Sequence, residues 1–162
     1  MAQVIYTDEL MFKGWEPKYK NRYVFKIDGI PSFMIKAANR PSPSSDEVVL
    51  DHINVQRKLK GKTTWGDVSI TLYDPISPSG AQAAFEWFRL SHESVTGRNG
   101  YADMYKKDCT IRILGPIGDV VEEWTLKGAW PKEVDMGDLD FSSAEPMEIA
   151  VTLAIDYAIL QY

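Results

Sequence analysis

The sequence has one cysteine, two histidines and fewer basic than acidic residues, and each shortage excludes a class of site or partner. Cys109 has no second cysteine with which to form a disulfide or a zinc site, and it lies in phase with Ile111 and Ile113, as a buried apolar residue would. His52 and His92 have no metal-ligand partner at helical or hairpin spacing. The net charge of −5 argues against a general affinity for nucleic acid, because phosphate contacts require a surplus of Lys and Arg.

Long apolar runs and catalytic motifs are also missing. No run approaches the roughly 18 apolar residues of a membrane-spanning helix, and the N-terminus lacks a charged segment followed by an apolar one. There is no phosphate-binding glycine loop, dinucleotide fingerprint or nucleophile elbow. Glu122 and Glu123 are adjacent on a predicted strand and so face opposite sides, which is wrong for shared acid–base chemistry. The sequence therefore predicts a chain made in a cytoplasm, without membrane insertion, cofactor or enzymatic activity.

The acidic stretch that begins at Asp135 does not fit a calcium-binding loop. If the loop started there, Gly137 and Leu139 would stand where an EF-hand needs oxygen ligands. If it started at Asp138, Ser143 would stand where the EF-hand needs glycine. The stretch is therefore predicted to be a solvated acidic loop without a metal.

What the sequence has in quantity is alternating apolar and polar residues, with many aromatic side chains among them. Its 162 residues suffice for one domain, and five Trp, eight Tyr and six Phe suit packed cross-strand pairs. Only residues 78–92 place apolar side chains at helical spacing. The pattern predicts a single domain over residues 1–162 that is mainly β (α+β). We expect an antiparallel β-sandwich or barrel-like domain of about seven or eight strands, with one flanking amphipathic helix.

The strand pattern is clearest near the C-terminus. Residues 147–157 alternate with a period of two, which predicts one long strand with a single buried face. Residues 23–37 contain two alternating runs around Gly29 and Pro31, which predicts a hairpin. Residues 1–20 have no clear period and are interpreted as an N-terminal arm.

The segment from residue 47 to residue 67 contains the one basic cluster of this acidic sequence, placed after a predicted strand over residues 47–55. Such a cluster predicts the tip of a hairpin, which is either simply solvated or protrudes to meet an acidic surface on another copy. The cluster comprises Arg57, Lys58, Lys60 and Lys62, with Leu59 among them.

Several blocks of residues together resemble a known family. The C-terminal blocks are Lys127-Gly128-Ala129-Trp130-Pro131, Val134, Leu139-Asp140, Glu148 and residues 151–157. The upstream blocks are Asn21-Arg22-Tyr23-Val24-Phe25, Gly61-Lys62-Thr63-Thr64-Trp65 and residues 68–72, followed by the amphipathic helix. In this order, and over about residues 21–157, the chain resembles the tail tube proteins of contractile-tailed bacteriophages.

The resemblance implies a structural virion protein. Six copies would form a ring whose inner strands make one continuous β-barrel, and the rings would stack into a rigid tube inside a contractile sheath. The tube would carry DNA out of the virion. The implied partners are other copies of the chain, the tail sheath protein, the baseplate and tape-measure proteins, and DNA that passes without specific binding. The implied location is the phage tail, assembled in the host cytoplasm.

Two sets of site residues follow as hypotheses from this resemblance. In the first, a basic loop of one ring stacks on acidic residues of the next, with apolar loop packing as the alternative to charge. This set comprises Arg57, Lys58, Leu59, Lys60, Lys62, Trp65, Glu133, Asp135, Asp138 and Asp140. In the second, the polar face of the C-terminal strand lines a water-filled lumen or contacts a neighbouring subunit. This set comprises Ala150, Thr152, Ala154 and Asp156.

Two other interpretations stay open at this point. An inner tube protein of a bacterial secretion or extracellular contractile injection system would share the fold but would not conduct DNA. A monomeric β-sandwich binding module would use aromatic residues such as Trp87 and Trp130 as a ligand platform.

Overall fold

The computed structural model describes residues 16–161, which form nine strands and two short α-helices. Most of the predicted N-terminal arm, residues 1–15, and Tyr162 lie outside the described residues. The strands are β1 (Tyr23–Lys26), β2 (Ile35–Ala38), β3 (Pro43–His52), β4 (Val55–Trp65), β5 (Val68–Tyr73), β6 (Lys107–Leu114), β7 (Val120–Asp135), β8 (Glu148–Ala154) and β9 (Tyr157–Leu160). The helices are the 3₁₀ turn η1 (Ser32–Met34), α2 (Gly80–Ser91) and α3 (Ala102–Tyr105).

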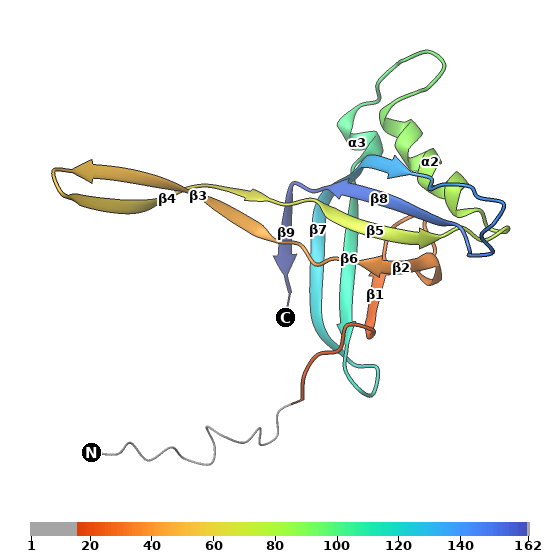
Figure 1. The fold of residues 1–162 in the computed structure, drawn as a ribbon, viewed down its shortest axis with the longest axis horizontal. Coiled ribbons are helices and arrows are strands. Elements are labelled where there is room, and N and C mark those ends of the chain that lie inside the picture. Colours follow the sequence, from red (N-terminus) through yellow and green to blue (C-terminus); the bar gives the residue numbers. More distant parts are fainter. Residues whose placement is uncertain (1–15, 162) are drawn as a thin grey trace.

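Seven strands form one strongly bent antiparallel sheet in the order β1-β6-β7-β8-β5-β2, and β9 pairs with β7 beside this path. The long strand β7 belongs to both halves of the sheet, because residues 120–129 pair with β6 and residues 130–135 pair with β8. In Figure 1, strands β8, β5 and β2 cross β6, β1 and the first half of β7. The remaining strands, β3 and β4, form a separate hairpin. The predicted class, a mainly β antiparallel domain with a flanking helix, is confirmed.

A glycine allows β7 to bend between the two halves of the sheet. Gly128 has φ +65°, a conformation that L-residues other than glycine rarely adopt, and the pairing with β6 shifts register beside it. Asp108 on β6 holds the bend, since one carboxylate oxygen accepts from the Gly128 N–H at 3.3 Å. The other oxygen accepts from Lys127 Nζ at 2.6 Å.

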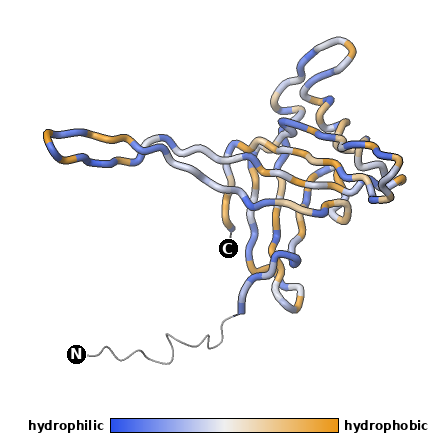
Figure 2. Tube along the Cα trace, viewed as in Figure 1, coloured by the Kyte–Doolittle hydropathy of each residue, from blue (hydrophilic) through white to orange (hydrophobic). Residues whose placement is uncertain are grey.

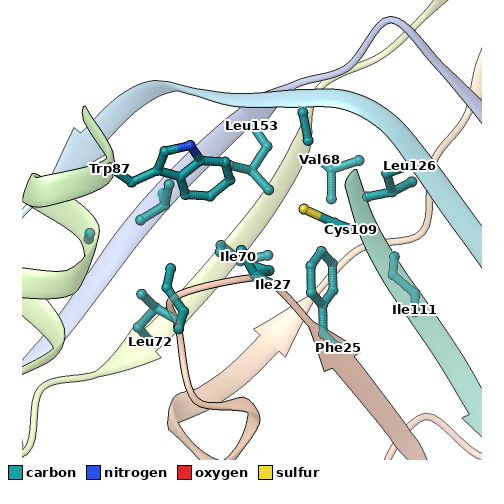
Figure 3. Close-up of a cluster of buried hydrophobic side chains, with 14 of the residues drawn as sticks. Phe25, Ile27, Val68, Ile70, Leu72, Trp87, Cys109, Ile111, Leu126 and Leu153 are labelled. Carbon is teal, nitrogen blue, oxygen red and sulfur yellow. The ribbon is translucent and has the colours of Figure 1, made fainter. Parts of the chain in front are cut away.

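The core lies between the two halves of the sheet. Figure 3 shows Phe25, Cys109 and Ile111 from the first half facing Val68, Ile70 and Leu153 from the second, with Trp87 of α2 at one end. Alternate residues of β5 and β8 are buried, as the period-two pattern requires. Cys109 is fully buried, which agrees with its interpretation as a small core residue.

Helix α2 begins after Ser79, whose side chain accepts a hydrogen bond from the Gln82 N–H. Asp74, at the end of the β5 segment, adds a second cap by accepting from the N–H groups of Gly80 and Ala81. The helix points Trp87 into the core, and the indole N–H donates to the Tyr105 carbonyl at 2.7 Å.

Two strand predictions are wrong. Residues 23–37 do not form a hairpin: the η1 turn separates two strands that pair elsewhere, β1 with β6 and β2 with β5. Residues 147–157 do not form one strand either. Strand β8 ends at Ala154, and β9 continues along the same edge of β7 from Tyr157. The interruption at residues 155–156 lies opposite Gly128, because the pairing strands must turn where β7 bends.

Candidate assembly surfaces

The β3–β4 hairpin projects from the domain as a two-stranded arm along the longest axis of the molecule (Figure 1). Its tip is at Ile53 and Asn54, between the paired residues His52 and Val55. The prediction that the basic cluster forms the tip is therefore wrong: these residues lie along β4, and Trp65 lies at the base of the arm. Gly61 also lies within strand β4.

The arm has two different faces, because residues paired across a hairpin share a face. One face combines four apolar side chains with a guanidinium and an imidazole group: Val48, Leu50, His52, Val55, Arg57 and Leu59. The other face is mostly charged or polar: Glu47, Val49, Asp51, Gln56, Lys58 and Lys60. Hydrophobic and hydrophilic segments alternate along the arm in Figure 2. All residues of the arm from Pro43 to Lys60 are exposed.

The positive charge of the arm is largely compensated within the arm. The hairpin carries four cations and three carboxylates, and Lys58 Nζ lies 3.1 Å from Glu47 Oε1. Both side chains of this pair are more than half exposed, so the pair itself adds little stability. The arm therefore offers apolar surface more than net charge.

The loop between β7 and β8 forms a pocket of about 890 Å³. Met136, Pro146 and Met147 contribute apolar wall, and the side chains of Leu139 and Phe141 are exposed beside them. Carboxylates stand around the same opening: Asp138, Asp140, Glu145 and Glu148. The backbone N–H and the hydroxyl group of Ser142 both donate to the Asp140 carboxylate. These two hydrogen bonds hold the pKa of the Asp140 carboxyl below its ordinary value.

The arm and this pocket lie at opposite ends of the molecule's longest axis (Figure 1). The structure therefore does not bring the predicted basic and acidic residues together within one chain. It also divides the acidic set, because Glu133 and Asp135 are on strand β7, whereas Asp138 and Asp140 are in the loop. A surface at one end that complements a surface at the other end favours head-to-tail association.

The outer face of β5 and β8 carries small or polar side chains, except at its end, where Tyr73 pairs with Glu148. Ser69 pairs with Thr152 and Thr71 with Ala150, all on the face turned away from the core, while Ala154 is half-buried on the same side. Glu133 and Asp135 continue this face onto β7.

Both lysines next to this outer face are paired with carboxylates. Lys36 contacts Glu148, and this hydrogen bond raises the pKa of the lysine. Lys132 Nζ lies 2.9 Å from Asp67, which likewise raises the pKa of Lys132. A face of this kind is wettable and offers little to bind phosphate.

Two predicted residues have a different environment from the one expected. Asp156 is not on β8 but in the interruption before β9, where it accepts from Lys106 Nζ at 2.9 and 3.0 Å. Trp87 is 3% exposed and so cannot serve in a ligand platform. Trp130 is half-buried against the edge of the Tyr105 ring, with the ring centroids 5.9 Å apart.

Sequence reasoning missed one charged cluster that fixes the start of the described chain. Glu122 on β7 is buried, and its carboxylate accepts from Lys18, from Arg40 and from the Trp124 indole. Burial alone would raise the pKa of this carboxyl, but the three donors outweigh it and the pKa is lowered. No periodic signal marks this cluster, since its cations come from irregular segments.

Residues 16–161 contain neither a cluster of metal-type ligands nor a helix that could span a membrane. Within this range, no three His, Cys, Asp or Glu side chains converge as metal ligands would. No helix in the same range is long and apolar enough to cross a membrane.

The fold is that of tube proteins from contractile injection machines. One similar structure comes from the extended sheath–tube complex of an extracellular contractile injection system, PVC, with a TM-score of 0.71 and 18% identity. The match covers 98% of this chain and 99% of that one. Another is the tube-terminating cap of the anti-feeding prophage, with a TM-score of 0.74 and 17% identity over 93% of this chain and 95% of the other.

Sequence comparison identifies the family. Residues 20–158 match the family described as T4-like virus tail tube protein gp19, and the chain belongs to this family. The tail tube protein gp19 of Enterobacteria phage T4 is 26% identical over 131 residues, which are 78% of this chain and 79% of the relative. The tail tube protein of Serratia phage KSP90 is 22% identical over 108 residues, 66% of this chain and 61% of the relative. The chain is thus a structural tail component, and the family resemblance seen in the sequence is confirmed.

Proposed function

We propose that six copies of this chain form a ring, that rings stack into a rigid tube inside a contractile sheath, and that DNA leaves the virion through the lumen. The observation that carries the proposal is the division of exposed surface between the two ends of the molecule. An arm of exposed apolar and basic residues projects at one end, and an acidic pocket opens at the other (Figure 1). Identical copies joined through two different surfaces form a ring or a filament rather than a closed dimer.

The outer face of the sheet suits the wall of the lumen. Strands β7 (residues 130–135), β8, β5 and β2 lie side by side and alternate in direction. Four is an even number, so copies related by rotation about the tube axis can continue the alternation from one subunit to the next. Side chains such as Thr71, Ala150 and Thr152 would then face water, with Glu133 and Asp135 repelling the phosphates of passing DNA.

The direction of the arm suits contact between rings. In Figure 1 the arm lies roughly along the line of strand β5 and extends beyond the start of that strand, past the edge of the domain. If the sheet strands run roughly along the tube, the arm reaches toward the next ring, and the β7–β8 loop faces the ring on the other side. Arg57, Lys58, Lys60 and Lys62 would then approach the carboxylates of that loop, each exposed pair contributing about 0–1 kcal/mol.

The other partners follow from the relatives. Similar chains occur in a sheath–tube complex and in the baseplate of the anti-feeding prophage, so we extend contacts with sheath and baseplate proteins to this chain. The structural likeness to those machines also supports the second candidate, an injection tube without DNA. The 26% identity to the phage T4 protein supports the phage tail as the first candidate.

Electron microscopy of the concentrated, purified protein tests the proposal. Rings or tubes with a central hole are the expected result. A protein that stays monomeric at all concentrations, even when purified baseplate is added as a template, would contradict it. Tails joined to DNA-filled heads in lysates of the source cells would indicate the phage tail, whereas sheathed tubes without heads or DNA would indicate the injection tube.

A further inference from the structure

The tip of the arm carries an apolar side chain in a backbone conformation that does not suit it. Ile53 has φ +50° and is 91% exposed. A β-branched residue is a rare occupant of this left-handed region, where glycine or asparagine is expected in a two-residue turn. Ile53 is the only residue other than glycine among residues 16–161 with positive φ.

No contact among residues 16–161 accounts for isoleucine at this position. The arm is separate from the seven-stranded sheet, and its tip is far from the core (Figure 1). A strained conformation with a large exposed apolar group is typical of a contact made with a partner. Val55, the next apolar residue of the arm, is also mostly exposed and extends this surface from the tip.

The pocket at the other end of the molecule complements this tip. Its wall contains Met136 and Met147, and Leu139 and Phe141 are exposed at its opening. Its volume of about 890 Å³ is large enough for more than one side chain. The surrounding carboxylates, among them Asp138, match the sign of the basic residues that follow Val55 on the arm.

We propose that Ile53 of one copy inserts into the β7–β8 loop pocket of a copy in the next ring, and that this apolar contact is the main anchor of stacking. The inference rests on the proposed tube function and names the contact that function requires. Val55 packs behind Ile53, and Arg57 on the same face meets the carboxylates of the loop. Because the arm's cations are largely compensated by its own carboxylates, charge adjusts the register of the contact rather than driving it.

Replacing Ile53 with asparagine separates anchoring from folding. Asparagine tolerates positive φ, so I53N is expected to fold at least as stably as the wild type while losing the apolar anchor. The matched control is I117N, the same substitution at a 90% exposed position in the turn between β6 and β7. F141S removes an exposed aromatic group from the receiving pocket.

Two measurements are made on each variant. Negative-stain electron microscopy gives the tube length, and sedimentation velocity gives the mass of the ring. We expect I53N and F141S to form single rings of wild-type mass and to lose at least tenfold in mean tube length. The control I117N should form tubes of wild-type length. Tubes of normal length from I53N would overturn the inference and leave the proposed function standing. A wild-type protein that never forms rings would instead overturn the proposed function.

A mixture of the two defective variants adds a sharper test. A ring of F141S still has an intact tip, and a ring of I53N still has an intact pocket. The tips of an F141S ring can therefore enter the pockets of an I53N ring, whereas every other contact lacks either the tip or the pocket. We expect the mixture to form ring doublets but no tubes. A mixture that forms only single rings would show that the tip and this pocket are not partners, which would also overturn the inference.

Discussion

Replacing Glu122 with glutamine would test how the described N-terminal residues are held to the sheet. The substitution keeps the shape of the side chain and removes the charge that Lys18 and Arg40 share. Glu122 is only 8% exposed, so its carboxylate depends on these donors in place of water. We expect E122Q to fold but to be measurably less stable at neutral pH.

The size of the effect follows from the exposure of the partners. Breaking a fully buried ion pair costs about 3–5 kcal/mol. Here Lys18 and Arg40 are 52% and 62% exposed, so water can solvate them again once the carboxylate is gone. The loss should therefore be closer to that of hydrogen bonds to a charged group, about 1.5–3 kcal/mol. Urea unfolding at pH 7, at a concentration where the protein is unassembled, measures this difference.

The pH dependence has a definite sign. The pKa of Glu122 is lower in the folded protein than in the unfolded chain, so its stabilisation is fully present above the unfolded value, about 4.3. It is lost as the pH falls through the folded pKa. The stability gap between the wild type and E122Q should consequently narrow as the pH falls below about 4.3, and it should close once the pH is below the folded pKa.

The neighbouring variant E123Q is the control. Glu123 faces the other side of β7 and pairs with Arg112 at 2.6 Å, an exposed partner, so its loss should cost no more than about 1 kcal/mol. Equal effects of E122Q and E123Q at pH 7, or a stability gap for E122Q that does not narrow as the pH falls below about 4.3, would refute the reasoning.

Three further predictions concern the arm, the bend and the core. Reversing the charge of Lys58 and Lys60 together should shorten tubes, most of all at low salt, and change unfolding free energy by less than about 0.5 kcal/mol; normal tubes from this variant would contradict the charged register. In G128A, the new Cβ would lie 2.1 Å from Asp156 Oδ2 at a backbone φ of +65°, so thermal unfolding should show a loss of about 1–3 kcal/mol, and an unchanged midpoint would argue against a strained bend. Burial raises the pKa of the Cys109 thiol to about 12, so a disulfide reagent at pH 8 should label it only after denaturant is added, and rapid labelling of the folded protein would show that the core is open.

The elements that sequence analysis located well are those with a strong local period. The buried alternation of β8 and the helix α2 both follow from the spacing of their apolar residues. The family was recognisable for a different reason, because its blocks combine residues at the bend, such as Gly128, with the strands on either side.

The pairing of strands was harder to predict from the sequence, because it depends on contacts between residues that are far apart in the chain. Residues 23–37 look like a hairpin, yet the η1 turn buries Met34 and directs β2 to β5. The tip of the arm was misplaced because Ile53 has a high strand propensity and so gives no signal of a turn. Gly61, in contrast, is a residue type that is common in turns. Asn54 was the one residue there whose type indicated a turn.

The arrangement of the candidate site residues was not predicted. The basic and acidic sets were named correctly as exposed groups, but their sequence did not reveal that they lie at opposite ends of the molecule or that Glu133 and Asp135 belong to a strand. The pocket was also beyond prediction, since it depends on how one irregular loop folds back beside Met147.

Cryo-electron microscopy of assembled protein tests the central claim most directly. The account predicts stacked rings in which Thr71, Ala150 and Thr152 line the central channel and each β3–β4 arm contacts the adjacent ring. A reconstruction with α2 facing the channel, or with the arm folded against its own domain and no contact between rings, would contradict it.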